Sequence, residues 1–390
     1  MSGQVRSGGR DGRRERASTP QQPPLPATLA EFAELARERL DPGTFGYYAG
    51  GAGAEITLHD NEAAWARLRL RPRMLVDVSR RDTSTTFLGQ RLAHPICVAP
   101  TAFHRLAHPD GEKATAAGAA RAQAPLCLST LATARPSEIA EAAPEATRWF
   151  QVYMFRDRGV TRALCEEAAA SGFSALFLTV DVPYFGRRER DLRTGFALPA
   201  LEVPSLAAAV GEPDARLDMR AIGELLDASL TWRDLEELVG TSDLPVVVKG
   251  VLTAEDARRA IASGAAAVVV SNHGGRQLDG VRAAADALPE VVEEVGEEVD
   301  VLVDGGIRRG TDVLKALALG ARAVLVGRPV LWGLAVAGAA GVERVLRLLI
   351  DDFDLSLALC GVPRACDLGT SVLERSLHGP RAVGRESGTF

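Results

Sequence analysis

The stretch VVVSNHGGRQLDG, residues 268–280, places a histidine and an arginine three residues apart directly after an apolar run. His273 can take up a proton near neutral pH, and Arg276 carries a fixed positive charge. Gly274 and Gly275 lie between them and let the chain turn sharply. The pair is suited to removing a proton from a substrate that carries a negative charge.

Apolar runs rich in β-branched residues recur along the chain, and each precedes a helix-like segment. The runs are continuous rather than alternating, which is typical of parallel strands buried on both faces. The segments 253–264 and 311–320 each open at Thr and close at Gly, as helices commonly do. Eight strand–helix units predict an α/β fold, a (β/α)8 TIM barrel. The predicted strands are 96–100, 126–130, 149–155, 175–183, 245–250, 266–273, 301–306 and 323–329.

The segments around these units predict one barrel domain, residues 28–375, between two tails. Residues 28–95 are predicted to form a helical extension that packs across the rim or bottom of the barrel. The long gap between strands four and five holds residues 196–219, which are rich in Pro and Ala and predict a loop insertion acting as a lid or binding loop. Residues 1–27 predict a disordered tail, and residues 376–390 a flexible one.

Composition narrows the class of protein. The net charge of −6 does not favour a nucleic-acid partner, and the absence of a run of about 18 apolar residues predicts no membrane-spanning helix. The N-terminus has no apolar stretch of the kind a signal peptide needs. Five cysteines without a CxxC pair predict buried free thiols, a reducing compartment and therefore a cytoplasmic protein. No metal site is expected.

Polar residues follow every predicted strand, and in a barrel of this class the carboxyl ends of the strands meet at one mouth. A lone histidine at a strand end is more often an ordinary surface residue, but polar groups at eight strand ends indicate a site. Lys249 is notable because the chain has only three lysines among its many arginines. The polar candidates at the strand ends are Thr101, Ser129, Gln151, Tyr153, Thr179, Asp181, Lys249, Ser271, His273, Arg276, Asp304 and Arg328.

Two glycine turns follow strands seven and eight, DGGIRRG at 304–310 and GRP at 327–329. In barrels these two loops commonly bind phosphate through backbone N–H groups and a short helix N-terminus. Arg308 and Arg328 can add charge-assisted hydrogen bonds. The turns therefore predict a phosphate site, for a substrate or a cofactor. No GxGxxG motif opens a helix, which disfavours a Rossmann dinucleotide site.

Several of these segments closely resemble the FMN-dependent 2-hydroxy acid oxidases and dehydrogenases, over about residues 28–370. The resemblance implies a (β/α)8 barrel with non-covalent FMN, commonly a tetramer, that oxidises an L-2-hydroxy acid to the 2-oxo acid. The segments that carry it are SNHGGRQLDG, LTVDVPYFGRRERD, VVVKG, VDGGIRRGTDVLKALALGA and VLVGRPVLWGL.

By position, His273 matches the catalytic base of the family and Asp181 the carboxylate that orients it. Arg188 and Arg276 match the pair that holds the substrate carboxylate. This chemistry suits the residue types, because a fixed carboxylate stabilises an imidazolium and two arginines orient a planar carboxylate. Two tyrosines that hydrogen-bond the substrate are matched by Tyr47 and Tyr153.

The resemblance also implies the residues that hold FMN. Lys249 matches the lysine beside the N1/O2 edge of the flavin, where a cation stabilises the reduced ring. The flavin-ring contacts are matched by Pro100, Thr101, Ala102, Ser129, Gln151, Thr179 and Ser271. The ribityl and phosphate contacts are matched by Asp304, Gly306, Arg308, Gly327 and Arg328.

The sequence leaves alternatives open for two properties, the electron acceptor and the size of the substrate side chain. Oxygen, giving hydrogen peroxide, is the favoured acceptor, and Ala102 lies where oxidases of this family often have Ala. A quinone or protein acceptor is the alternative, while a flavin-dependent barrel isomerase and a non-catalytic flavin-binding barrel fit the His–Arg pair less well. Glycolate oxidases carry Trp at the position that Leu131 matches, so a bulkier or aromatic acid is expected here.

Overall fold

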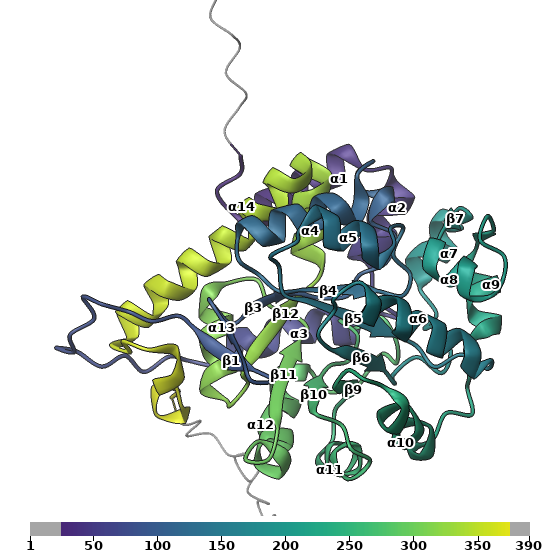
Figure 1. The fold of residues 1–390 in the computed structure, drawn as a ribbon. Coiled ribbons are helices and arrows are strands. Elements are labelled where there is room, and N and C mark those ends of the chain that lie inside the picture. The colour runs from purple at the N-terminus through teal and green to yellow at the C-terminus, as the bar shows by residue number, and fades with distance from the viewer. Residues whose placement is uncertain (1–24, 375–390) are drawn as a thin grey trace, which may run out of the picture.

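A closed barrel of eight parallel strands forms the centre of the chain in a computed structural model that describes residues 25–374 (Figure 1). The strands neighbour one another in the order β10-β11-β12-β3-β4-β5-β6-β9. All eight predicted runs form these strands, which confirms the predicted (β/α)8 barrel. Their bounds are β3 Ile96–Val98, β4 Leu126–Ser129, β5 Arg148–Val152, β6 Leu176–Thr179, β9 Val246–Val251, β10 Ala267–Val270, β11 Asp300–Asp304 and β12 Ala323–Val326.

Helices surround the barrel, as Figure 1 shows. The last of them, α14, contains a kink where Ala337 and Gly338 leave helical geometry. Among residues 25–374, no helix is both long and apolar enough to cross a bilayer. The helices that follow the barrel strands are α4 Gly111–Arg121, α5 Pro136–Ala142, α6 Arg158–Ala170, α10 Trp232–Thr241, α11 Ala254–Ala262, α12 Ala284–Val295, α13 Gly310–Ala318 and α14 Arg328–Cys360.

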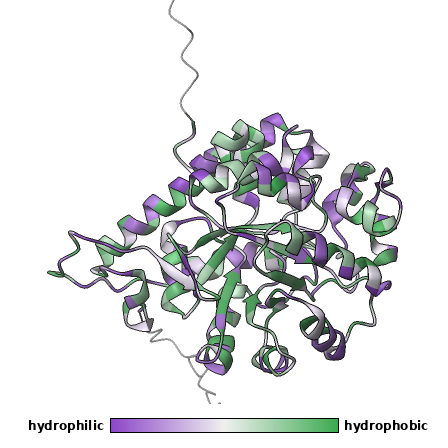
Figure 2. Cartoon of the chain, viewed as in Figure 1, coloured by the Kyte–Doolittle hydropathy of each residue, from purple (hydrophilic) through white to green (hydrophobic). Residues whose placement is uncertain are grey.

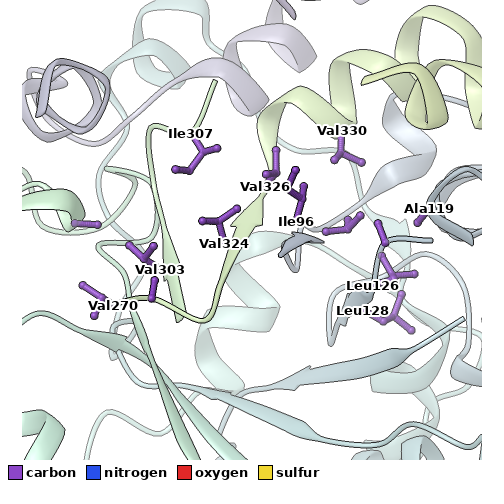
Figure 3. Packing of buried hydrophobic residues seen from close by; sticks show 14 of the residues in the cluster. Ile96, Ala119, Leu126, Leu128, Val270, Val303, Ile307, Val324, Val326 and Val330 are labelled. Atoms are coloured by element: carbon purple, nitrogen blue, oxygen red, sulfur yellow. The ribbon is translucent and has the colours of Figure 1, made fainter. Parts of the chain in front are cut away.

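The strands are apolar on both faces because each face is covered. In β12, Val324 and Val326 belong to the large hydrophobic cluster between strands and helices, whereas Ala323 and Leu325 belong to a second cluster inside the barrel. Val324 and Val326 lie near Val330 of α14 in Figure 3. The barrel strands are accordingly mostly green in Figure 2, while the helices alternate in hydropathy. This burial of both faces explains the continuous apolar runs in the sequence.

The bottom of the barrel is closed by a β-hairpin rather than by helices. The strands β1 Thr85–Phe87 and β2 Gln90–Leu92 pair antiparallel. The Phe87 ring lies 5.0 Å from that of Trp149, near the start of β5, and both rings belong to the cluster inside the barrel. The predicted helical extension is confirmed for α1 Leu29–Arg39, α2 Pro42–Ala49 and α3 Ile56–Arg67, but it is wrong for this hairpin.

The predicted loop at 196–219 contains short regular elements and is flanked by two more. A two-stranded sheet joins distant parts of the segment, and such a pairing is not visible in the local hydrophobic periodicity of the sequence. Residues 1–24 and 376–390, where the two tails were predicted, lie outside the described residues. The elements of the insertion are α7 Glu189–Thr194, β7 Leu201–Glu202, α8 Pro204–Ala209, β8 Arg216–Leu217 and α9 Met219–Leu225.

The cysteines are unpaired, and four of them, Cys97, Cys127, Cys165 and Cys360, are buried as predicted. Cys97 and Cys127 face the inside of the barrel, where burial raises the pKa of both thiols. Cys366 is exposed, contrary to the prediction, because it lies in the short 3₁₀ turn Ala365–Asp367 after α14.

Candidate active site

A cavity of about 1160 Å³, including its open mouth, lies at the carboxyl ends of the barrel strands. Asp181 and Ser271 are not part of its lining but contact residues that are. The predicted site residues that line it are Tyr47, Pro100, Thr101, Ala102, Ser129, Gln151, Tyr153, Thr179, Arg188, Lys249, His273, Arg276, Asp304, Gly306, Arg308, Gly327 and Arg328.

His273 is held by a buried carboxylate. Its Nδ1 lies 2.9 Å from Oδ1 of Asp181, a residue 92 positions earlier in the chain. Burial by itself raises the pKa of Asp181, but the charge and hydrogen bond of His273 and the charge of Lys249 outweigh it and lower the pKa. The carboxylate is therefore ionised and keeps a hydrogen on Nδ1, which leaves Nε2 of His273 as the proton acceptor.

The backbone around this pair is specialised to bring the two side chains together. His273 adopts a left-handed conformation with φ of 57°, which is costly for a residue with a Cβ. The hydroxyl of Ser271 accepts a hydrogen bond from the backbone N–H of His273 at 3.0 Å and stabilises this turn. A Cβ on Gly250 would lie 2.7 Å from that of Asp181, so only glycine admits the carboxylate here.

Two arginines contact the ring of Tyr47. The guanidinium carbons of Arg188 and Arg276 lie 4.8 and 5.1 Å from the centre of this ring. Burial and the charge of Arg188 lower the pKa of Arg276 to about 10. Nη1 of Arg188 is buried without a hydrogen-bond partner among the described residues. Two cations beside one ring, one of them with an unused donor, are suited to binding a carboxylate.

The carboxyl end of α2 positions Tyr47. Arg276 donates to the backbone carbonyls of Tyr47 and Gly50 at 2.7 and 2.9 Å. Arg328 donates to the carbonyl of Gly50 at 2.8 Å and to that of Gly274 at 3.0 Å. The last carbonyls of a helix are unpaired within it and carry partial negative charge, so two arginines stabilise them. The α2 helix is thereby held against the mouth of the barrel.

Lys249 links Asp304 in the cavity lining to Ser271, which in turn bonds the backbone of His273. Its Nζ lies 2.9 Å from Oδ2 of Asp304 and donates to the hydroxyl of Ser271 at 2.9 Å. Burial lowers the pKa of this lysine, but the charges of Asp304 and Asp181 outweigh burial and raise it. Lys249 is therefore a buried and fully charged ammonium group. It supplies fixed positive charge beside the cavity.

Besides Nη1 of Arg188, two further buried polar atoms in the cavity lining have no hydrogen-bond partner among the described residues. The side-chain oxygen of Gln151 accepts from the hydroxyl of Ser129 and from the backbone N–H of Thr130, both at 3.2 Å, which leaves its amide Nε2 as the unpaired donor. Oδ1 of Asp304 is the unpaired acceptor. Unpaired buried polar groups cost stability unless a ligand satisfies them. The pair fits a ligand with both acceptors and hydroxyl donors, as FMN has.

The glycine turns form another part of the cavity lining. Gly306 has φ of 79°, and a Cβ there would lie 2.2 Å from the carbonyl oxygen of Asn61, so the turn requires glycine. Arg308 lies 2.8 Å from Oε1 of Glu62 on α3, and burial lowers its pKa. Burial and the charges of nearby arginines lower the pKa of Arg328 as well. Two partly buried guanidinium groups, of which one is paired with the exposed carboxylate of Glu62, favour a phosphate.

The start of α13 differs from the prediction. It begins at Gly310 with Arg309 at the N-cap, whereas the predicted start was Thr311. The carboxylate of Asp312 accepts from the backbone N–H groups of Arg308 and Arg309, and Asp352 accepts from Gly310. These carboxylates already cap the helix, so a phosphate would rely on the arginines and the glycine turns. By contrast, α11 begins after Thr253 as predicted.

Several cavity residues were missed by the sequence reasoning. Gln277 donates to the backbone carbonyls of Asp181 and Tyr184 and accepts from the N–H of Gly186, which fixes the segment leading to Arg188. The position of Gln277 directly after Arg276 in the GGRQ motif could have indicated that it belongs to the site. The other missed lining residues, which are mostly apolar and carry no local signal, are Tyr48, Ala99, Val182, Phe185, Met219, Gly274, Gly305, Ile307, Leu325, Val326 and Leu331.

The fold and the cavity define a class of protein: a barrel enzyme whose cavity holds a carboxylate-supported histidine, two arginines beside a tyrosine, and glycine turns with two further arginines. Residues 36–375 match the family described as FMN-dependent dehydrogenase. The chain is 50% identical over 357 residues to an L-lactate oxidase of Nostoc sp., covering 89% of this chain and 98% of that protein. It is 46% identical over 342 residues to 2-hydroxyacid oxidase 1 of Homo sapiens, covering 85% of this chain and 92% of that protein.

A solved structure of a mandelate oxidase with (S)-2-phenylpropionate is also similar, with a TM-score of 0.80 and 42% identity, covering 90% of this chain and 98% of that one. The chain belongs to the family of FMN-dependent dehydrogenases. Its cofactor is FMN.

We expect Arg308→Ala to weaken FMN binding by about 1.5–3 kcal/mol, or roughly 10- to 150-fold, through loss of a charge-assisted phosphate contact. Glu62→Gln should act in the opposite direction, because it removes the carboxylate that competes with the phosphate for Arg308. FMN dissociation constants from flavin fluorescence measure both effects. Arg309→Ala, at the exposed neighbouring position, is the control. Equal FMN affinity in Arg308→Ala and wild type would place the phosphate elsewhere.

Proposed function

We propose that this chain oxidises a bulky, most simply an aromatic, L-2-hydroxy acid to the 2-oxo acid, with oxygen as the electron acceptor. The chain is an FMN-dependent oxidase of 2-hydroxy acids, as its relatives named L-lactate oxidase and 2-hydroxyacid oxidase are by name. The single observation that carries the proposed site is the His273–Asp181 hydrogen bond beside the Arg188–Arg276 pair.

Each side chain at this end of the cavity has a role in the proposal. Arg188 and Arg276 bind the substrate carboxylate, and Tyr47 and Tyr153 hydrogen-bond the substrate. Nε2 of His273 takes up a proton as the substrate loses its hydrogens. Asp181 keeps the imidazole in the required tautomer and stabilises its positive charge. Tyr153 acts as a neutral hydrogen-bonding group, since burial raises the pKa of its hydroxyl.

FMN fits the remaining residues. Bound FMN supplies the two-electron acceptor for the oxidation. Its phosphate would be held by Arg308 and Arg328 and by the turns at Gly306 and Gly327. Asp304 would accept from a ribityl hydroxyl. Lys249 would place its charge beside the N1/O2 edge of the ring. The ring contacts that we propose are Pro100, Thr101, Ala102, Ser129, Gln151, Thr179 and Ser271.

The reaction is tested by mixing the protein with a panel of 2-hydroxy acids without oxygen and following the loss of flavin absorbance. Readmission of air should restore the absorbance and release hydrogen peroxide. Restoration by a quinone or a protein acceptor but not by air would favour the alternative acceptor. Colourless protein with no affinity for added FMN would contradict the proposed function as a whole.

The preference for a bulky substrate rests on the apolar part of the cavity. Leu131 lines it together with Val182, Phe185 and Met219, the last of which begins α9 in the long insertion. An apolar wall of this kind stabilises a substrate side chain larger than that of glycolate. The similarity to a mandelate oxidase structure also supports a preference for a bulky substrate.

We expect wild type to prefer mandelate over glycolate by about 10- to 200-fold in kcat/KM, the range typical of one added apolar contact. Leu131→Trp should fill this space and lower kcat/KM for mandelate more than for glycolate. Steady-state kinetics with both acids measure the effect. Leu355→Trp, which adds the same side chain at an exposed position of α14, is the control. A wild-type preference for glycolate, or equal losses on both acids, would show that Leu131 does not determine substrate size.

We also propose that the enzyme is a cytoplasmic homotetramer. The support is the resemblance to a family whose members are commonly tetramers and the unpaired state of the cysteines in the described residues. Light scattering coupled to size-exclusion chromatography measures the oligomeric state, and cell fractionation measures the location.

A further inference from the structure

A buried histidine outside the catalytic pair contacts the lining of the cavity. His104 begins the 3₁₀ turn His104–Leu106 and is 2% exposed. Its Nε2 lies 2.6 Å from the hydroxyl oxygen of Thr101, and its Nδ1 lies 2.9 Å from the hydroxyl oxygen of Thr115 on α4. Thr101 lines the cavity, whereas Thr115 is fully buried. The imidazole therefore joins the cavity wall to the interior.

The loop that carries His104 is fixed by a buried carboxylate. Glu112, which is 1% exposed, accepts a hydrogen bond from the backbone N–H of His104 at 3.0 Å. It also accepts from the backbone N–H and the hydroxyl of Thr133. Burial lowers the pKa of His104 more than the charge of Glu112 raises it, so the ring is neutral. One ring nitrogen then donates and the other accepts.

The neighbours of Thr115 indicate which nitrogen carries the hydrogen. The hydroxyl of Thr115 has two acceptors within reach, Nδ1 of His104 at 2.9 Å and the carbonyl of Gly111 at 3.5 Å. If Nδ1 carried the hydrogen, the buried hydroxyl hydrogen of Thr115 would be left with only the carbonyl of Gly111 at 3.5 Å, the outer limit of a hydrogen bond. Donation to Nδ1 at 2.9 Å satisfies this hydroxyl better, so the hydroxyl donates to Nδ1. Nε2 then carries the hydrogen and donates to the oxygen of Thr101. The hydroxyl hydrogen of Thr101 is left to point away from the imidazole, into the cavity.

We propose that His104 is a positioning residue that makes the hydroxyl of Thr101 a hydrogen-bond donor to the bound flavin ring, with Thr115 selecting the required tautomer. The inference rests on the proposed function, because it requires FMN in this cavity. It accounts for a buried histidine between two threonines, of which only one lines the cavity. With the opposite tautomer, Thr101 would donate to Nε2 and offer the flavin only lone pairs.

A double-mutant cycle on the holoenzyme tests the proposal. Thr101→Val should weaken FMN binding about 2- to 12-fold, the range of one neutral hydrogen bond, and shift the midpoint potential of the bound flavin. His104→Leu should reproduce both effects, and the double variant should add nothing further. His104→Gln should retain wild-type values, because its amide N–H can replace the Nε2 donor.

Thr115→Val is the second arm, since it keeps the imidazole but removes the hydroxyl that selects the tautomer. It should shift the potential in the same direction as Thr101→Val. Additive effects of Thr101→Val and His104→Leu, or wild-type behaviour of Thr115→Val, would overturn the proposal while leaving the proposed function intact. Failure of the wild-type protein to bind FMN would instead contradict the proposed function. If His104→Leu does not fold, Thr115→Val and His104→Gln still decide the question.

Discussion

Replacing His273 by Gln is expected to leave FMN bound but to lower the rate of flavin reduction by substrate by about 10²- to 10⁴-fold, the usual effect of losing a general base. Glutamine fills a similar volume but cannot take up the proton. The measurement is anaerobic stopped-flow absorbance of the flavin under saturating substrate. FMN affinity should stay near the wild-type value, because His273 is not among the proposed FMN contacts.

His59→Gln is the matched control, since the His59 side chain is 74% exposed on α3 and far from the proposed chemistry. Asp181→Asn should also slow reduction, because it removes the charge that stabilises the imidazolium and the acceptor that fixes its tautomer. Flavin reduction by His273→Gln at nearly the wild-type rate would mean that another residue is the base.

Replacing Arg188 by Gln is expected to lower kcat/KM by about 30-fold to several thousand-fold, the range for removing one partner of a desolvated charge pair. The side chain of Arg188 lines the cavity and has a buried, unpaired Nη1, which we propose for the substrate carboxylate. Most of the loss should appear in binding, so KM rises. Steady-state kinetics and anaerobic substrate titration of the flavin separate binding from chemistry.

Arg193→Gln is the control for this variant, because Arg193 lies on the same short helix, α7, but its side chain is 72% exposed. The same substitution there should leave kcat/KM unchanged. An Arg188→Gln variant with wild-type kcat/KM would remove Arg188 from the substrate site. Arg276→Gln is a less specific test, because Arg276 also holds the end of α2 through the carbonyls of Tyr47 and Gly50.

The sequence by itself determined the barrel and the position of its mouth. Parallel strands buried on both faces must be apolar throughout, so runs such as 301–306 and 323–329 were visible without any structure. The turn at Gly306 and the proximity of His273 to Arg276 are local in the chain, and local spacing predicts local geometry. The β1–β2 hairpin was missed because its two strands are only three residues each and are held by contacts with Trp149 and Asp300.

Only the tertiary structure decided which side chains meet across the mouth. Asp181 reaches His273 because β6 and β10 both pair with β9 and because Gly250 has no Cβ to block the approach. Tyr47 contacts Arg276 because Arg276 pairs with the carboxyl end of α2, far away in the sequence, and its ring also contacts Arg188. Such contacts depend on barrel closure and on side-chain direction, which spacing along a chain does not specify. The hydrogen bond between His104 and Thr115 likewise depends on side-chain direction, so it could not be predicted from the sequence.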